Sequence, residues 1–222
     1  GITVKDIHDR LFPALQTLSA KCWTGAATSF SFEDFNRLRL ALSEAPAVNE
    51  AARWQKGKQL RIETLNPGQT TGEKEVGYGY RVEFTIEGAD EPKGMVLFSS
   101  DNATFYLSDP ESGLLGFAHE GYLNKFNYRV EKGKKVTLAI TGDNKKTCLY
   151  VDGKLREELG PITLYAMQQK DLAAFQKSDA TATQPIVYNP SAKMHYQRTL
   201  VFPLQKAGDF KSRITGVKVE QE

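Results

Sequence analysis

The segments YGYRVEFTIEG (residues 78–88) and KTCLYVDGKLREEL (146–159) decide the fold of this chain of 222 residues. In the first segment every second residue from Tyr78 to Ile86 is apolar, which is the period of a strand with one buried face. The second segment places Asp152-Gly153 between two apolar runs, and this dipeptide is typical of a two-residue hairpin turn. Both patterns predict antiparallel β-structure.

Short strand-like segments recur on both sides of these two. They are separated by Gly, Asn and Asp residues and lie at 59–65, 94–100, 103–109, 114–120, 135–143, 198–205 and 210–221. Many short strands joined by such turns are typical of a sandwich or a barrel. We therefore predict a mainly β fold, a jelly-roll β-sandwich over residues 51–222. Residues 160–193 break the strand pattern and are expected to form a long insertion.

The opening of the chain has a different period. Apolar residues recur at intervals of three and four over residues 4–23, which predicts a helix with a kink or a restart at Pro13. Ser31, followed by two acidic residues, predicts the start of a second helix. Two short helices bury little surface by themselves, so we expect residues 1–50 to need a partner and Trp23 to be buried.

The composition excludes several classes of protein. The 29 Lys and Arg residues against 27 Asp and Glu give a net charge of +2, which is no basic excess for a nucleic-acid partner. No apolar run approaches the ~20 residues of a membrane-spanning helix. Cys22 and Cys148 are expected to be buried free thiols, because two cysteines make no disulfide framework.

No motif predicts a catalytic nucleophile, and we predict no cofactor. His8, His119 and His195 lie in separate elements without the spacing of metal ligands. Calcium stays open, because turns rich in Asp and Asn supply the oxygen atoms that it prefers. The candidate donors are Asp101-Asn102, Asp109 with Glu111, and Asp143-Asn144. The alternative is that these residues only form turns.

Carbohydrate binding requires exposed aromatic side chains, whose flat faces stack on sugar rings. Tyr106 and Tyr150 alternate with apolar residues that are expected to face the core, so their side chains are predicted to face solvent. Tyr122 lies in or near a predicted loop. These three tyrosines are the candidate carbohydrate-binding residues, and the alternative is that they are ordinary surface side chains.

Two parts of the chain resemble known families. The stretch LFPALQTLSAKCWTGAATSFSFEDFNRL (11–38) is similar to the end of the catalytic barrel of family-20 glycoside hydrolases, the β-N-acetylhexosaminidases. The matching residues are Phe12-Pro13, Lys21-Cys22-Trp23 and Asp34-Phe35-Asn36-Arg37-Leu38. The departures are Ala14, where that family has Arg, and Ser19-Ala20, where it has Ala-Glu. The stretches VTLAI (136–140), LYVDGKL (149–155) and FKSRITGVKV (210–219) resemble the concanavalin-A-like, laminin-G-like jelly rolls appended to secreted glycosidases.

The resemblance implies that the chain is the C-terminal part of a longer periplasmic or secreted enzyme that removes terminal N-acetylhexosamine from glycans. Residues 1–50 would be a helical remnant of the upstream catalytic barrel, and that barrel would be the partner of an accessory sandwich at 51–222. Such enzymes use an adjacent Asp-Glu pair in substrate-assisted catalysis. The one such pair here, Asp90-Glu91, lies in a predicted turn, so no catalytic residue is assigned and the fragment is expected to be inactive.

Two alternatives to an accessory domain stay open. A freestanding carbohydrate-binding module would bind soluble glycans through Tyr106 or Tyr150. A purely structural spacer would bind no ligand. An exposed apolar patch around Leu11, Leu15 and Leu18 would favour the spacer, because such patches mark a lost partner.

Overall fold

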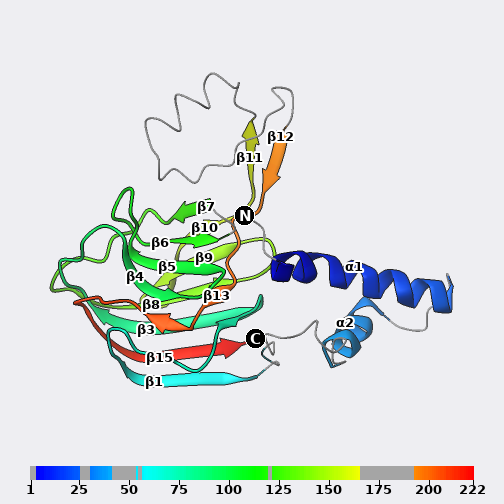
Figure 1. Cartoon of the computed structure of the whole chain (residues 1–222), viewed down its shortest axis with the longest axis horizontal. Coiled ribbons are helices and arrows are strands. Elements are labelled where there is room, and N and C mark those ends of the chain that lie inside the picture. The colour runs from blue at the N-terminus through cyan, green and yellow to red at the C-terminus, as the bar shows by residue number, and fades with distance from the viewer. Residues whose placement is uncertain (1–3, 26–30, 42–53, 55–56, 120–121, 166–192) are drawn as a thin grey trace. The chain divides into compact units, whose positions relative to one another are not determined.

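The computed structural model describes residues 4–25, 31–41, 54, 57–119, 122–165 and 193–222 (Figure 1). The chain divides into two compact units, Gly1–Gln55 and Lys56–Glu222. The helices and strands are α1 (Val4–Thr24), α2 (Phe32–Ala41), β1 (Gln59–Leu65), β2 (Glu75–Val76), β3 (Tyr80–Glu87), β4 (Met95–Ser99), β5 (Ala103–Ser108), β6 (Gly116–His119), β7 (Tyr122–Lys125), β8 (Lys135–Gly142), β9 (Thr147–Val151), β10 (Lys154–Leu159), β11 (Ile162–Tyr165), β12 (Lys193–Tyr196), β13 (Phe202–Pro203), β14 (Lys206–Ala207) and β15 (Arg213–Gln221).

The first unit holds the two predicted helices. Helix α1 has 21 residues and runs through position 13 without a restart. Ser31 caps α2, because its Oγ accepts a hydrogen bond of 3.1 Å from the Asp34 N–H. Trp23, which we expected to be buried against an upstream barrel or the sandwich, is 88% exposed. The other exposed large apolar residues of this unit are Leu11, Leu15, Leu18, Phe32 and Leu38.

The second unit is a sandwich of two antiparallel sheets. The six-stranded sheet has the order β1-β15-β3-β8-β9-β10, and the five-stranded sheet has the order β14-β4-β5-β6-β7. Figure 1 shows the two sheets stacked face to face. The last strand, β15, lies between β1 and β3. These sheets confirm the prediction of a mainly β jelly-roll sandwich preceded by two helices.

The core lies between the sheets and follows from the alternation in each strand. On β3 the side chains of Tyr80, Val82, Phe84 and Ile86 are buried, while the residues between them are partly exposed. Phe202 of β13 joins the two inner faces. Its ring centroid lies 5.7 Å from that of Tyr80 in one sheet and 5.1 Å from that of Phe105 in the other.

The predicted hairpin at Asp152-Gly153 is present between β9 and β10. Both residues have positive φ, 47° and 77°, as a type I′ turn requires. The turn is also tied to β8, because the Thr137 N–H donates to Asp152 Oδ1 at 2.9 Å and the Asp152 N–H donates to the Thr137 carbonyl at 2.8 Å.

The insertion contributes a small sheet of its own. Strands β11 and β12 pair with each other from Ile162↔Tyr196 to Tyr165↔Lys193. The short helix that the sequence indicates at 169–178 lies outside the described residues. Of the strand expected at 198–205, only β13 forms, and it pairs with β2. Strand β7 was not predicted.

Tyr80 generates a prediction about stability. Its hydroxyl is buried without a hydrogen-bond partner among the described residues, and burial raises the pKa of the phenol well above its usual value. Removing an unsatisfied buried group is neutral or favourable. We therefore expect Tyr80→Phe to leave the free energy of unfolding unchanged or to raise it, as measured by chemical denaturation.

Gly142 provides the contrasting variant for the same experiment. A Cβ atom at this position would overlap the Tyr80 ring, so Gly142→Ala should lower the free energy of unfolding by about 1–3 kcal/mol. A loss of stability in Tyr80→Phe as large as that in Gly142→Ala would contradict this account of the Tyr80 hydroxyl.

Candidate functional site

The outer face of the five-stranded sheet presents a group of side chains over β5, β6 and β7. Phe105 and Phe117 point into the core, so the residues that alternate with them point outward. The pairing continues in register across three strands, as Tyr106↔Gly116↔Lys125 and Thr104↔Ala118↔Leu123. We call the outward group of Thr104, Tyr106, Ala118, Leu123 and Lys125 the Tyr106 face. Each of its members is partly exposed.

The side chain of Tyr106 is partly buried beside Thr104 of the same strand. Burial raises the pKa of the Tyr106 phenol, a hydrogen bond with the Thr104 hydroxyl lowers it in part, and the Asp109 charge raises it further. Thr104 precedes Tyr106 by two residues on the same side of β5.

The loop after β5 brings Glu111 to Lys125 of β7. Asp109 Oδ1 accepts hydrogen bonds of 2.8 Å from the N–H groups of Glu111 and Ser112, and its Oδ2 accepts one of 2.8 Å from the Leu114 N–H. Burial would raise the pKa of Asp109, but these bonds and one from the Ser112 hydroxyl hold the pKa below its usual value. The fixed loop places Glu111 Oε2 at 2.8 Å from Lys125 Nζ.

Tyr150, the second candidate, lies on the opposite outer face of the molecule. It belongs to β9 in the six-stranded sheet and pairs with Ala139 and Leu155. The guanidinium carbon of Arg81 lies 5.5 Å from the centroid of its ring, a cation–π contact. One face of the Tyr150 ring is therefore occupied by a side chain of the protein.

Tyr122, the third candidate, begins strand β7. Its ring packs on that of Tyr196, with centroids 4.6 Å apart, and the Tyr196 hydroxyl accepts a hydrogen bond of 2.9 Å from Asn124 Nδ2. The three candidate tyrosines thus lie in three separate environments and form no common platform. Tyr106 is the candidate on the outer side of the five-stranded sheet, beside the Thr104 hydroxyl.

The candidate calcium donors Asn102, Asp109 and Asp143 make hydrogen bonds within the protein. Asp109 binds its loop as described above, and Asp143 Oδ1 accepts hydrogen bonds of 2.7 and 2.9 Å from the N–H groups of Lys145 and Lys146. Asn102 donates to Glu75. In the described part of the chain, no three His, Cys, Asp or Glu side chains gather as a metal site would require.

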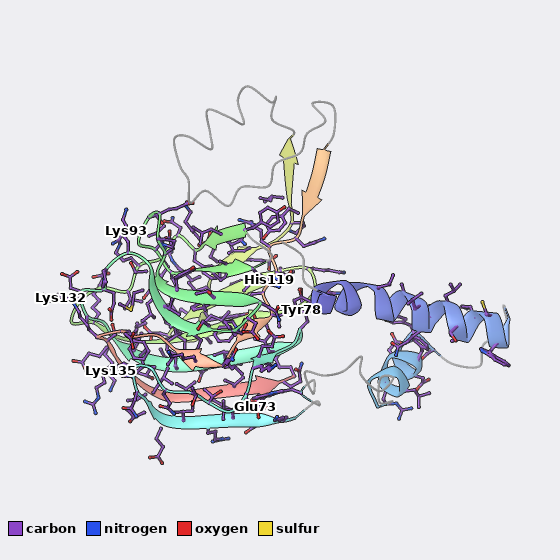
Figure 2. All side chains as sticks on the ribbon, viewed as in Figure 1. Glu73, Tyr78, Lys93, His119, Lys132 and Lys135 are labelled. Atoms are coloured by element: carbon purple, nitrogen blue, oxygen red, sulfur yellow. The ribbon has the colours of Figure 1, made fainter. Side chains whose placement is uncertain are left out.

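The remaining polar residues considered from the sequence have local roles. His119 and Tyr78, labelled in Figure 2, both contact Thr199, through its carbonyl at 2.9 Å and its hydroxyl at 3.1 Å. Both cysteines are free, but only Cys148 is buried, so the expected burial of Cys22 is wrong. Neither described helix is long and apolar enough to cross a membrane.

Comparisons with solved structures give remote neighbours of this chain. No protein-family model and no curated protein sequence matches the chain. The galectin LEC-6 of Caenorhabditis elegans is 8% identical, with a TM-score of 0.39 over 72% of this chain and 95% of that one. Domain 4 of the GH43 extracellular arabinanase AbnA of Geobacillus stearothermophilus, in complex with arabinotriose, is 11% identical, with a TM-score of 0.34 over 73% and 66%. A sialidase of Trypanosoma rangeli is 14% identical, with a TM-score of 0.30 over 77% of this chain and 26% of its own length. The fold assignment rests on the sheets and registers given above.

The Asp90-Glu91 pair lies in the turn that the sequence predicts. Glu91 Oε1 accepts three hydrogen bonds, from the Lys211 N–H at 2.8 Å, the Ser212 N–H at 2.7 Å and the Ser212 hydroxyl at 2.8 Å. The Ser212 hydroxyl in turn accepts one of 2.9 Å from the Ala89 N–H. Glu91 therefore links the turn after β3 to the start of β15 through hydrogen bonds.

This role of Glu91 predicts an effect on stability. Glu91→Ala leaves two backbone N–H groups without their acceptor and should lower the free energy of unfolding by about 1–3 kcal/mol. Glu91→Gln should cost less, because its amide oxygen can still accept both bonds. The matched control is Glu63→Ala, on the exposed edge strand β1. Equal losses in Glu91→Ala and Glu63→Ala, measured by thermal denaturation, would contradict the structural role.

Proposed function

We propose that the sandwich is a non-catalytic carbohydrate-binding domain whose ligand lies on the Tyr106 face. The observation that carries this proposal is the flat aromatic ring of Tyr106, a partly exposed outward residue of β5 in the five-stranded sheet. The apolar side of a sugar ring stacks on such an aromatic ring, and its hydroxyl groups need donors and acceptors beside it. The Thr104 hydroxyl and the Lys125–Glu111 pair supply these groups.

In the register, Gly116 lies between Tyr106 and Lys125, and Ala118 is the outward residue two positions further along β6. Gly116 itself is buried, because the Asn124 carbonyl and the Asp109 side chain fill the space beside it. Ala118 is therefore the small residue of β6 that is partly exposed near Tyr106. The contrast with Tyr150 supports the choice of Tyr106, because the guanidinium of Arg81 already covers one face of the Tyr150 ring.

Binding measurements on Tyr106 variants test the proposal. A glycan array identifies the ligand, and calorimetry gives its dissociation constant. Tyr106→Ala should weaken binding about tenfold or more, while Tyr106→Phe should retain most of it because the stacking face is kept. Tyr150→Ala is the control on the other sheet and should bind like the unmodified chain. Equal affinity of the unmodified chain and Tyr106→Ala would refute the site, and binding to no glycan would refute the function.

We further propose that this domain is an accessory part of a larger periplasmic or secreted glycoside hydrolase, a β-N-acetylhexosaminidase, and that residues 1–50 belong to its upstream barrel. The resemblance of residues 11–38 supports this. The exposed side of α1 is the observation that favours a structural role for the helical unit, as in the spacer alternative. Leu11, Leu15 and Leu18 are 48%, 45% and 60% exposed and are spaced to lie on one side of the helix. Exposed apolar stripes of this kind mark a missing partner, so the helical unit would act as the structural link.

The coding sequence upstream of Ile2 tests this second proposal. It should encode several hundred further residues that include an adjacent Asp-Glu pair at the end of a strand. The chain of 222 residues, assayed alone with an aryl N-acetyl-β-glucosaminide, should show no hydrolysis, because its own Asp90-Glu91 pair serves a turn. A signal peptide directly upstream, or hydrolysis by the 222-residue chain, would rule out the accessory role.

A further inference from the structure

The outward side chains of the five-stranded sheet form a row that crosses all of its strands. In register, the row runs through Lys206 on β14, Ser99 on β4, Thr104 on β5, Ala118 on β6 and Leu123 on β7. We call these five residues the cross-strand row. Neighbouring strands lie about 4.8 Å apart, so its four intervals span about 19 Å.

The chemistry of the cross-strand row changes along its length. Lys206 and the hydroxyls of Ser99 and Thr104 provide polar groups on one side, while Ala118 and Leu123 provide an apolar surface on the other. All five side chains are at least partly exposed. The three central residues are small, so no bulky side chain of the row interrupts it between Lys206 and Leu123. Tyr106 lies in the neighbouring row, beside its centre.

The span of the cross-strand row, about 19 Å, exceeds what one sugar can contact. A single ring covers one or two strand spacings, so it cannot reach both Lys206 and Leu123. An extended glycan, in contrast, advances with each sugar by a distance close to the spacing of β-strands. Successive sugars of a linear chain laid across the strands would therefore meet successive members of the row.

We infer that the cross-strand row binds the interior of a linear glycan, at about one sugar per strand, and not a single sugar at a chain end. This inference rests on the proposed function and specifies its ligand class. Tyr106 stacks on a central sugar, the hydroxyls of Ser99 and Thr104 bond to sugars on one side of it, and Lys206 and Leu123 contact the outermost sugars.

A series of oligosaccharide lengths tests the inference. The probes are β-1,4-linked oligomers of N-acetylglucosamine, glucose and galactose, each with one, two, four and six sugars, titrated by calorimetry. In the series that binds, affinity should rise about tenfold or more between two and four sugars and level off by six. Equal affinity for all lengths would overturn the inference.

Variants at one end of the row give a second readout. Lys206 is exposed, so Lys206→Ala should fold normally and weaken binding of the four- and six-sugar probes several-fold without changing that of the one-sugar probe. Lys218→Ala, on the outer face of the other sheet, is the matched control and should change neither. An equal loss at every length in Lys206→Ala would also overturn the inference.

The outcomes separate this inference from the function on which it rests. Length-independent binding that is still lost in Tyr106→Ala leaves the carbohydrate-binding function in place and removes only the linear ligand. Binding to chain-end or branched structures on the array, with no binding in any of the three series, has the same meaning. Binding to no glycan at all removes both.

Discussion

The ring of Phe202 lies between the two sheets and holds their inner faces in a fixed relation. It contacts Tyr80 on the six-stranded side and Phe98 and Phe105 on the five-stranded side, although its own strand, β13, pairs only with the two-residue β2. Truncation of such a buried ring to Ala lowers the free energy of unfolding by about 3–5 kcal/mol. Because side chains alternate along a strand, the choice of Phe105 as an inward residue also makes Tyr106 an outward one. A slip of one residue would exchange the two.

The outer faces of the two sheets differ in the hydrogen bonds and ion pairs that their side chains form with one another. On the six-stranded sheet, Arg81 pairs with Glu83 at 2.7 Å, Lys218 pairs with Glu220 at 2.6 Å, and the hydroxyls of Thr85 and Thr137 lie 3.2 Å apart. Such a face is already bonded to itself and gains little from a ligand. On the outer side of the five-stranded sheet, Lys125 pairs with Glu111 at 2.8 Å, and the central residues of the cross-strand row are small.

The sequence allowed prediction of the strands but not of how the three candidate tyrosines are distributed over the sandwich. The alternation from Tyr80 to Ile86 and the Asp152-Gly153 turn are local signals, and both features are present in the structure. Tyr106 and Tyr150 have the same local pattern, yet they lie on opposite sides of the sandwich, because sheet membership is set by pairing between strands far apart in the chain. Tyr122 begins a strand that has no alternation of its own and forms beside β6. The helical opening was predictable as helix, but the burial expected for Trp23 needs a partner surface that the local pattern cannot specify.

The contact between Tyr80 and Gly142 has a consequence for how related sequences can diverge. The ring occupies the space that any side chain at position 142 would need, and the two residues face each other directly across β3 and β8. Neither position can therefore change freely while the other stays fixed. A larger residue at 142 becomes acceptable only together with a smaller one at 80, so an alignment of relatives should show these two columns covarying as one unit.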